Sequence, residues 1–312
     1  MEKLVLNTSE DFANALHITH EGLRRICKKP KYKTFKIAKK NGGYREISAP
    51  SYELKILQKW ILVNILEKQE TSKYCTAFCK NKNGLKENAV FHKEQKYLLE
   101  IDLMDFYPSI SKAMVANLFR RLGYTNEISQ VFTSVCTFRN KLPQGGITSP
   151  CISNLVTKYL DEKIADYCSN KKIIYSRYAD DLTFSSNNLA ILRNSEKEII
   201  NLIQKNSRFK INESKTRLLT PNGRKQVTGI TINNNEIKVE KKIKRKIRAI
   251  IYHSLKNERF IDDESLKKLL GYISFVSSIE EDYRKKCINY IKYLIKKHNY
   301  SNSLGLIEIL EK

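Results

Sequence analysis

YSRYADDLTF, residues 175–184, places two neighbouring aspartates between two short runs of residues that favour β-strands. Asp is common in turns because its side chain hydrogen-bonds to the local backbone. Asp180 and Asp181 therefore predict the tip of a β-hairpin. Taken alone, the pattern favours an ordinary acidic turn over one half of a metal site, and the rest of the chain has to distinguish the two.

A second strand offers this hairpin a further carboxylate. Residues 97–103 (YLLEIDL) alternate as a strand, with Asp102 on the face opposite the apolar side chains. Mg²⁺ prefers oxygen ligands, and two such ions about 4 Å apart clamp the attacking and leaving oxygens of a phosphoryl transfer. Asp102, Asp180 and Asp181 on adjacent strands would supply that clamp. Solvent exposure at a surface turn would accommodate the same carboxylates equally well.

The charge of the chain points to a polyanionic partner. The 312 residues carry a formal charge of +24, from 57 Lys plus Arg against 33 Asp plus Glu. Such an excess is costly unless it meets nucleic acid or an anionic membrane surface. No apolar run approaches the roughly 20 residues that span a bilayer, and the N-terminus lacks the apolar core of a signal peptide. We therefore expect RNA or DNA as partner, no membrane, and a cytoplasmic location.

The seven cysteines are odd in number and scattered along the chain. Only Cys75 and Cys79 are close, and no second Cys or His pair follows at zinc-ligand spacing. They are expected to be reduced, mostly buried thiols rather than a disulfide framework or a zinc site.

The length and the 41% hydrophobic composition are enough for one large domain with subdomains or for two modest domains. Periodicity predicts a succession of helices and strands. Helices are expected over 9–28, 51–69, 111–122, 127–137, 150–168, 189–205, from about 240, and over 264–278 and 281–298. Strands are expected on both sides of the turn Asn41-Gly42-Gly43 within 30–50, and around 208–211, 216–220, 226–232 and 236–239. A polar loop is expected over roughly 71–88. The helices from 240 onward carry a basic surface.

Five stretches occur together in a fixed order: YREISAP (44–50), IDLMDFYPSI (101–110), LPQGGITSP (142–150), YADD (178–181) and KINESKT (210–216). In this order and at these separations they resemble the motif series of reverse transcriptases. One Y-x-D-D is a weak signal, whereas the ordered set is specific. The resemblance extends from about residue 30 to 240.

Two further stretches narrow the family. NAVFH (88–92) resembles the N-A-x-x-H motif of retron reverse transcriptases, and VTG (227–229) resembles their V-T-G triplet. The short length and the basic helical C-terminus fit the same group. The chain thus resembles a retron-type bacterial reverse transcriptase over nearly its whole length.

The resemblance implies an α+β fold, a right-hand polymerase with fingers, an antiparallel-sheet palm and a helical thumb. Fingers and palm are expected to interleave over 1–235, with a palm core at about 96–111 and 147–235. The thumb, basic and able to bind RNA or DNA, is expected over 236–312.

The family's catalytic aspartates fall on Asp102, Asp180 and Asp181 of this sequence. The resemblance implies that they bind two Mg²⁺ ions, with Mn²⁺ as an alternative. It also implies that the backbone carbonyl of Leu103 faces a metal.

The nucleotide-binding positions implied by the family are Arg45, Asp105, Phe106, Tyr107, Gln144 and Lys215. A ring at Tyr107 would collide with a ribose 2′-OH and select deoxynucleotides; the alternative is a buried core tyrosine. Arg45 would contact the triphosphate through its planar fork, assisted by Lys39 or Lys40, or is one more solvated base. Lys215 would protonate the leaving pyrophosphate or form a simple ion pair. Gln144 would contact the nucleotide or stabilise its own loop.

The remaining positions concern RNA. Asn88, Ala89 and His92 are expected to shape an RNA-binding or fold-stabilising element, since two-metal chemistry requires no histidine. Val227, Thr228 and Gly229 are expected at the cognate RNA or the primer end. The basic residues of the predicted thumb helix, taken to bind the nucleic-acid backbone, are Lys242, Arg245 and Arg248.

The function implied by the resemblance is RNA-directed DNA polymerisation. A retron enzyme copies a structured noncoding RNA of the msr-msd type from a 2′-OH primer, using dNTPs, and makes multicopy single-stranded DNA (msDNA). Such systems act in anti-phage defence, commonly with an accessory effector protein. The alternatives are a group II intron-like or diversity-generating reverse transcriptase, an RNA- and effector-binding scaffold with incidental polymerisation, and an RNA-templated RNA polymerase.

Overall fold

The structure is a computed structural model that describes residues 6–39, 42–80, 82–221, 223–233, 235–256, 263–300 and 305–311. Lys40 and Asn41, both named above for the first hairpin, lie outside these residues. The chain forms two compact units. The first comprises Met1–Gly84 and Tyr97–Leu218, and the second comprises Leu85–Lys96 and Leu219–Lys312.

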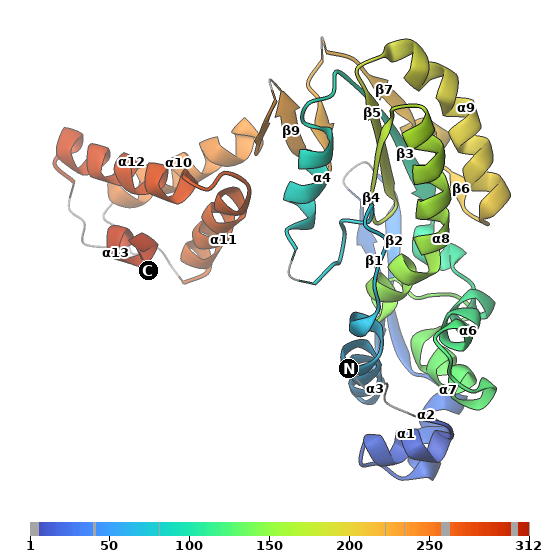
Figure 1. The fold of residues 1–312 in the computed structure, drawn as a ribbon. Coiled ribbons are helices and arrows are strands. Elements are labelled where there is room, and N and C mark those ends of the chain that lie inside the picture. The colour runs from blue at the N-terminus through green and yellow to red at the C-terminus, as the bar shows by residue number, and fades with distance from the viewer. Residues whose placement is uncertain are drawn as a thin grey trace. The chain divides into compact units, whose positions relative to one another are not determined.

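A mixed layer of sheet and helices forms the centre of the first unit (Figure 1). Its strands are β3 (Tyr97–Met104), β4 (Ile174–Tyr178), β5 (Asp181–Ser186), β6 (Lys210–Ile211) and β7 (Arg217–Leu219). The order is β4-β5-β3-β6, and β7 pairs with β3. The pairs β3–β5, β4–β5 and β3–β6 are antiparallel. The α+β class is thus confirmed, and the hairpin that carries Asp180 and Asp181 lies directly beside the strand that carries Asp102.

Two long helices pack against this sheet. Helix α8 (Ser149–Asn170) contacts β4, and α9 (Leu189–Asn206) contacts β3 and β5. Their apolar stripes, for example Ile152 and Ile164 of α8, are fully or almost fully buried. Burial of such stripes is the main driving force for helix–sheet packing, at about 25 cal/mol per Å². The helices thereby fix the strands from one side and leave the strand ends for chemistry.

The first unit also contains a second hairpin, β1 (Tyr32–Ala38) with β2 (Tyr44–Pro50), most of whose residues are exposed. The hairpin is closed by backbone hydrogen bonds of Lys39 with Gly42 and Gly43. The remaining helices of this unit are α1 (Ser9–Ala15), α2 (His20–Lys28), α3 (Tyr52–Asn64), α5 (Phe106–Ser109), α6 (Lys112–Arg121) and α7 (Asn126–Cys136), with the 3₁₀ turn η1 (Leu66–Lys68). Helix α7 contacts α1, α2, α3 and α6. Leu54, Leu57 and Ile61 of α3 form a buried apolar stripe.

Three elements predicted within the first 90 residues differ from the structure. The single helix expected over 9–28 is two helices, because His17 takes a left-handed φ of 53° between them and Thr19 caps a new helix. The loop expected over 71–88 ends early, since helix α4 (Gly84–His92) begins within it. The helix expected over 51–69 ends as an α-helix at Asn64 and continues only as η1.

The second unit joins α4 to a small sheet and a helical bundle. The sheet has the order β10-β9-β8, from β8 (Gln226–Val227), β9 (Ile230–Asn233) and β10 (Glu236–Lys238). The bundle consists of α10 (Lys241–Lys256), α11 (Asp263–Ile279), α12 (Tyr283–His298) and α13 (Leu306–Glu311). The strand expected over 226–232 is therefore a tight hairpin. The chain passes between the two compact units after Gly84, Lys96 and Leu218. The division into fingers and palm before residue 235 and a thumb after it stays a prediction.

Two expectations concern the chain as a whole. Among the described residues, which include every cysteine, none forms a disulfide. None of the described helices combines the length and apolarity needed to cross a lipid bilayer.

Candidate active site

Three carboxylates meet where strands β3 and β5 run side by side. Asp102 pairs directly with Asp181 in the antiparallel register. The Leu103 N–H donates to the Asp180 carbonyl at 2.9 Å, which ties the hairpin turn to the end of β3. The side chain of Asp102 is only 10% exposed. The register therefore matches the prediction that one strand and one hairpin bring these three residues together.

The electrostatics of the site reflect this crowding. Burial, followed by repulsion from Asp102, raises the pKa of Asp180, while Lys215 and Arg45 act in the opposite direction. Burial, then the charges of Asp180 and Asp102, raise the pKa of Asp181 to about 7, although that residue keeps contact with solvent. A carboxylate group that resists ionisation in this way is stabilised by a nearby cation.

Lys215 supplies one such cation. Its Nζ lies 2.8 Å from Asp102 Oδ2, and this bond raises the pKa of Lys215. Asn212, which was not among the predicted site residues, donates from Nδ2 to Asp102 Oδ1 at 3.2 Å and from its backbone N–H to the Asp102 carbonyl at 2.8 Å. Both residues come from the KINESKT stretch around η2 (Glu213–Lys215). The Asp102 carboxylate is thus paired with an amine in this structure.

The donor set suits a hard divalent cation. Carboxylate oxygens are the ligands that Mg²⁺ and Mn²⁺ prefer, and the mutual repulsion of Asp102, Asp180 and Asp181 would be relieved by one. Across the described ranges, however, no three Asp, Glu, His or Cys side chains already converge as a metal-binding cluster. In this structure both Asp102 carboxylate oxygens accept hydrogen bonds, Oδ2 from Lys215 and Oδ1 from Asn212. Leu103, expected to offer its carbonyl, has its side chain buried in the core.

Tyr107 follows Asp102 on a short turn of helix. Asp105 before it takes a left-handed φ of 45°, and Phe106 is buried while Tyr107 is half-buried. The rings of Phe106 and Tyr107 lie 5.5 Å apart in an edge-to-face arrangement. Burial, then the charge of Asp180, raises the pKa of Tyr107 to about 12. The phenol therefore stays neutral and lies close enough to Asp180 to sense its charge.

Arg45 lies on the exposed part of β2, opposite Ile37. Its positive charge opposes the rise in the pKa of Asp180 that burial causes. Salt screens the interaction between charges beyond about 10 Å. An effect of Arg45 on Asp180 therefore implies that the two side chains lie near each other. Lys39 is also exposed, and its backbone closes the hairpin turn.

The PQGG loop is joined to β2 by its backbone. The Gln144 carbonyl accepts the Ser48 N–H at 2.8 Å. Gly145 has a φ of 119°, and a Cβ there would lie 2.9 Å from the Ser48 carbonyl oxygen. A second support, Gln58, was not predicted: it is fully buried and accepts the Ile147 N–H at 3.0 Å. The sequence signal that could have indicated its burial is its position among the apolar residues of α3.

The NAVFH and VTG stretches meet within the second unit. Asn88, Ala89 and His92 are fully buried on α4. Asn88 Nδ2 donates to Thr228 Oγ1 at 3.4 Å, and Thr228 with Gly229 forms the left-handed turn between β8 and β9, at φ of 48° and 83°. Val227 is also fully buried. This packing supports the fold-stabilising interpretation of the NAVFH residues.

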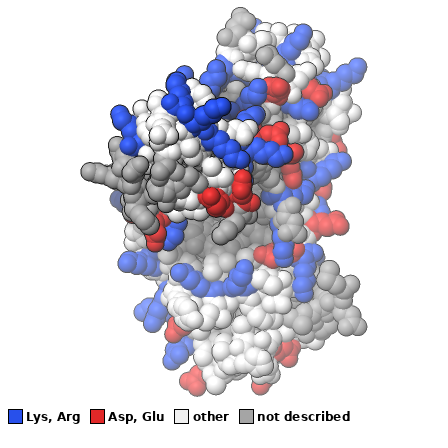
Figure 2. Space-filling model, turned by 90° about the vertical axis from the view of Figure 1, so that its left-hand side faces the viewer, with Lys and Arg blue, Asp and Glu red and all other residues white. Residues whose placement is uncertain are grey.

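The predicted basic residues lie on the outer face of α10. Lys242, Arg245 and Arg248 are exposed, whereas Ile247, Ile251 and Leu255 of the same helix are buried in the bundle. Figure 2 shows Lys and Arg side chains spread widely over the face that it presents, with acidic side chains between them. Among the other basic residues of α10, Lys244 is engaged with Glu280 at 2.8 Å.

Comparison with known proteins relates this geometry to a family. A family model described as "Reverse transcriptase (RNA-dependent DNA polymerase)" matches residues 37–272. "Retron Ec86 reverse transcriptase" of Escherichia coli is 33% identical over 298 residues, which cover 94% of this chain and 91% of that protein. "Retron Ec73 reverse transcriptase", also of Escherichia coli, is 32% identical over 292 residues, 86% of this chain and 90% of that protein.

A solved structure extends the likeness to the fold. Telomerase from Candida albicans, determined with a TWJ fragment of telomeric RNA, is similar with a TM-score of 0.53 and 12% sequence identity. The likeness covers 92% of this chain and 64% of that chain. At this identity it bears on the fold alone.

Proposed function

Since the chain belongs to the reverse transcriptase family, among the retron reverse transcriptases, we propose that Asp102, Asp180 and Asp181 hold the metal ions of its RNA-directed DNA polymerase reaction. Members of the family generally use divalent cations. The observation that carries the proposal is the pairing of Asp102 with Asp181, which brings carboxylates together at the end of β3. Burial, and then the charges of Asp180 and Asp102, raise the pKa of Asp181 to about 7.

Two Mg²⁺ ions, with Mn²⁺ as a substitute, would stabilise the charge that develops as the primer oxygen attacks the α-phosphate and pyrophosphate leaves. The task of this chain's own residues is to hold the reacting groups in line. The Leu103 carbonyl and the three aspartates would face the metals. Lys215 would leave Asp102 and turn its ammonium group towards the pyrophosphate, either to donate a proton or to neutralise charge.

The incoming dNTP would lie between the carboxylates and the β1–β2 hairpin. Arg45, whose charge already reaches Asp180, would pair with the triphosphate. Gln144 and the backbone of Asp105 and Phe106 would line the pocket, and Tyr107 would exclude a ribose 2′-OH. Gly145 supports this arrangement, because its missing side chain lets the loop approach Ser48 closely.

The template is RNA, and we propose its kind from the retron relatives. It would be a structured noncoding RNA of the msr-msd type, primed from the 2′-OH of a specific guanosine within that RNA to give msDNA. A role in anti-phage defence together with an accessory effector protein follows from the same proposal. Lys242, Arg245 and Arg248 would contact phosphates, and the Val227-Thr228-Gly229 turn would lie at the RNA.

The test replaces the metal ligands and leaves the fold unchanged. We expect Asp180→Asn with Asp181→Asn to lower DNA synthesis by roughly a thousandfold or more, because the transition state loses its charge stabilisation. Binding of the co-purified RNA should stay within about twofold. Asp166→Asn, which replaces an exposed acid on α8, serves as control and should keep full activity. A double variant that still makes DNA with Mg²⁺ would refute the assignment.

Further outcomes separate the alternatives. If the double variant loses DNA synthesis but retains its biological activity, the scaffold function is favoured. Sequencing the RNA that co-purifies distinguishes a retron RNA from a group II intron or a diversity-generating template. Ready incorporation of ribonucleotides by the unaltered protein would instead favour RNA synthesis.

A further inference from the structure

A charged side chain is buried next to the turn that carries Asp180 and Asp181. Arg177, in strand β4, is 0% exposed and stands among the largest fully buried side chains of the described chain. Burying a guanidinium group costs several kcal/mol unless its donors are satisfied. Its contacts therefore show what this residue does for the fold.

One side of the guanidinium group faces helix α8. Nε donates to Asp161 Oδ1 at 2.7 Å, and the terminal nitrogen NH2 donates to Asp161 Oδ2 at 2.8 Å. This is the bidentate geometry that a planar fork makes with a carboxylate. Asp161 is itself 0% exposed and also accepts the Tyr175 hydroxyl at 2.8 Å. Alternation places Tyr175 and Arg177 on one face of β4, so a single carboxylate holds both.

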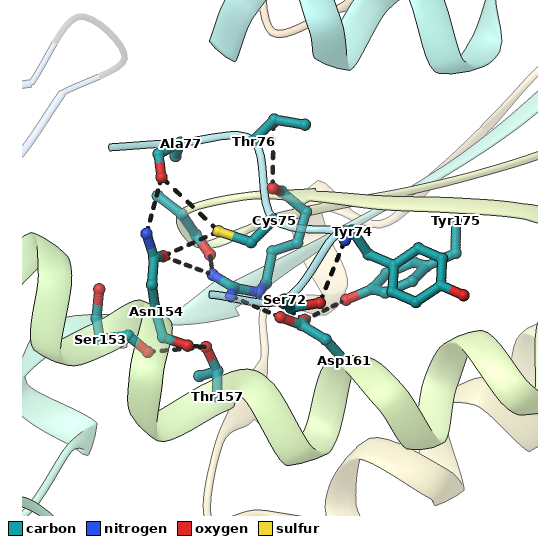
Figure 3. A network of polar contacts seen from close by, with 12 residues as sticks. Ser72, Tyr74, Cys75, Thr76, Ala77, Ser153, Asn154, Thr157, Asp161 and Tyr175 are labelled. Carbon is teal, nitrogen blue, oxygen red and sulfur yellow. Dashed lines mark hydrogen bonds and ion pairs between the residues drawn. The ribbon is translucent and has the colours of Figure 1, made fainter. Parts of the chain in front are cut away.

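The other terminal nitrogen faces the hairpin turn. NH1 of Arg177 donates to the Ala179 carbonyl at 3.1 Å and to Asn154 Oδ1 at 3.4 Å. Asn154 lies two helical turns before Asp161, on the same face of α8. Figure 3 shows Asn154 pointing from this helix towards Cys75 and Ala77, and Asp161 pointing towards Tyr175. Asn154 donates to the Ala77 carbonyl at 2.8 Å and accepts the Cys75 thiol at 3.0 Å.

The contact with Ala179 bears on Asp180. Ala179 takes a left-handed φ of 57° at the turn, a conformation that costs a non-glycine residue about 1 kcal/mol or more. The peptide group before Asp180 is held through the Ala179 carbonyl by Arg177. The peptide group after Asp180 is held through its own carbonyl by the Leu103 N–H at 2.9 Å. The two peptide groups on either side of Asp180 are thus fixed by different elements.

The backbone of Arg177 is held as well. Its N–H donates to the Tyr74 carbonyl at 2.8 Å, and its carbonyl accepts the Thr76 N–H at 2.9 Å. The guanidinium carbon also lies 6.0 Å from the Phe106 ring centroid. Arg177 therefore contacts the segment around Tyr74, the helix α8, the short helix after Asp105 and the turn itself.

We propose that Arg177 is a positioning residue for the metal site: its guanidinium group, anchored by Asp161, fixes the Ala179 peptide and with it the direction of the Asp180 and Asp181 carboxylates. This inference rests on the proposed metal-binding role of the two aspartates. Arg177 touches neither substrate nor metal in this assignment, and it acts through the turn.

The decisive variant removes the Arg177 guanidinium group together with the Asp161 carboxylate, so that no unpaired charge stays buried. Arg177→Met, Asp161→Leu and Tyr175→Phe together replace the network by apolar groups of similar size, a change that buried ion pairs often tolerate with no loss of stability. We expect a thermal midpoint close to that of the unaltered protein and an RNA affinity within about twofold. Mn²⁺ binding, followed by electron paramagnetic resonance on the full-length protein with its RNA, should weaken roughly tenfold or more. The kcat should fall by a similar factor.

Arg177→Lys is the second variant, and it decides the matter if the triple variant does not fold. It keeps the charge that neutralises Asp161 but lacks the planar fork that reaches Asp161 and Ala179 at once. We expect a folded protein with weaker Mn²⁺ binding and lower kcat, and with the KM for dNTP changed less than kcat. Lys244→Met with Glu280→Leu is the control for a general loss of stability, because it removes an ion pair in the second unit. This variant should leave Mn²⁺ binding unchanged.

The outcomes separate this inference from the function on which it rests. If either Arg177 variant is folded and has unaltered Mn²⁺ affinity and kcat, Arg177 is merely structural and the inference is wrong. Asp180→Asn is measured beside them. If Asp180→Asn binds Mn²⁺ and polymerises normally, the metal-site assignment itself fails, whatever the Arg177 variants do.

Discussion

At the scale of single residues, the proposed role of Tyr107 is to select the sugar of the incoming nucleotide. Its ring is packed edge-to-face on Phe106 and lies near enough to Asp180 for that charge to act on its pKa. We expect Tyr107→Ala to raise the efficiency of ribonucleotide incorporation relative to deoxynucleotides by roughly tenfold or more, equivalent to about 1.4 kcal/mol. Primer extension with matched rNTP and dNTP pairs measures this ratio. Tyr107→Phe keeps the ring and should keep the preference for deoxynucleotides. Equal use of ribonucleotides by both variants would contradict the proposal that the ring excludes the ribose 2′-OH.

Single residues also show how far the sequence could predict the site. The places of Asp102 on a strand and of Asp180 and Asp181 at a hairpin turn were predictable, because strand alternation and turn preference act locally. Their role as metal ligands came from the resemblance to reverse transcriptases and stays a prediction. Arg177 and Gln58 were not predicted, because a polar residue inside an apolar pattern is usually exposed and its partner lies far away in sequence. The ion pair of Arg177 with Asp161 spans a strand and a helix, and only the packing of α8 on β4 brings them together. In the sequence each of the two residues shows only as a polar residue within an apolar stretch, which does not reveal that its side chain is buried.

At the scale of elements, periodicity predicted the sheet and the long helices but not every boundary. The register of β3 with β5 follows from two clear strands, and α8 from a continuous apolar stripe. Helix α4 was missed at its start because GLKENAVFH shows no apolar face. Its buried residues are Asn88, Ala89 and His92, so tertiary contacts rather than hydropathy define that helix. The break at His17 depends on one backbone angle, which composition does not reveal.

Helix α4 makes a prediction about pH. Burial lowers the pKa of His92 to about 3, from an ordinary value near 6.5. The folded protein therefore keeps His92 neutral, whereas the unfolded chain takes up a proton below pH 6.5. The contribution of His92 to stability is complete above pH 6.5 and is lost as the pH falls. Between pH 7.5 and 5.0 we expect the free energy of unfolding to drop by about 2 kcal/mol through this residue.

Urea unfolding at the two pH values, compared between variants, measures the contribution of His92. His92→Gln should lose the part of the acid sensitivity that belongs to this side chain, even if it is less stable throughout. His253→Gln, which replaces an exposed histidine on α10, should retain the full acid sensitivity. An unchanged pH dependence in His92→Gln would mean that the buried imidazole is protonated in the folded protein.

At the scale of the whole molecule, the charge of +24 is compatible with a function that requires contact with a long polyanion. The candidate residues are distributed over the two compact units. The three carboxylates and the nucleotide-binding candidates belong to the first unit, and the exposed basic residues of α10 belong to the second. RNA and RNA–DNA hybrids share an A-like shape that proteins contact through phosphates and sugars. Binding is therefore expected to be governed by charge more than by base sequence in the second unit.

Salt dependence tests this directly. Each phosphate contact releases condensed counterions, so the slope of log affinity against log salt counts the contacts. We expect the triple variant Lys242→Gln, Arg245→Gln and Arg248→Gln to reduce the magnitude of this slope by about 2 to 3, measured by fluorescence anisotropy with a labelled RNA–DNA hybrid. Lys163→Gln, Lys171→Gln and Lys172→Gln remove the same charge from exposed positions on and after α8 and should change the slope by less than about 1. An equal reduction in both triple variants would mean that net charge alone, and not the face of α10, determines binding.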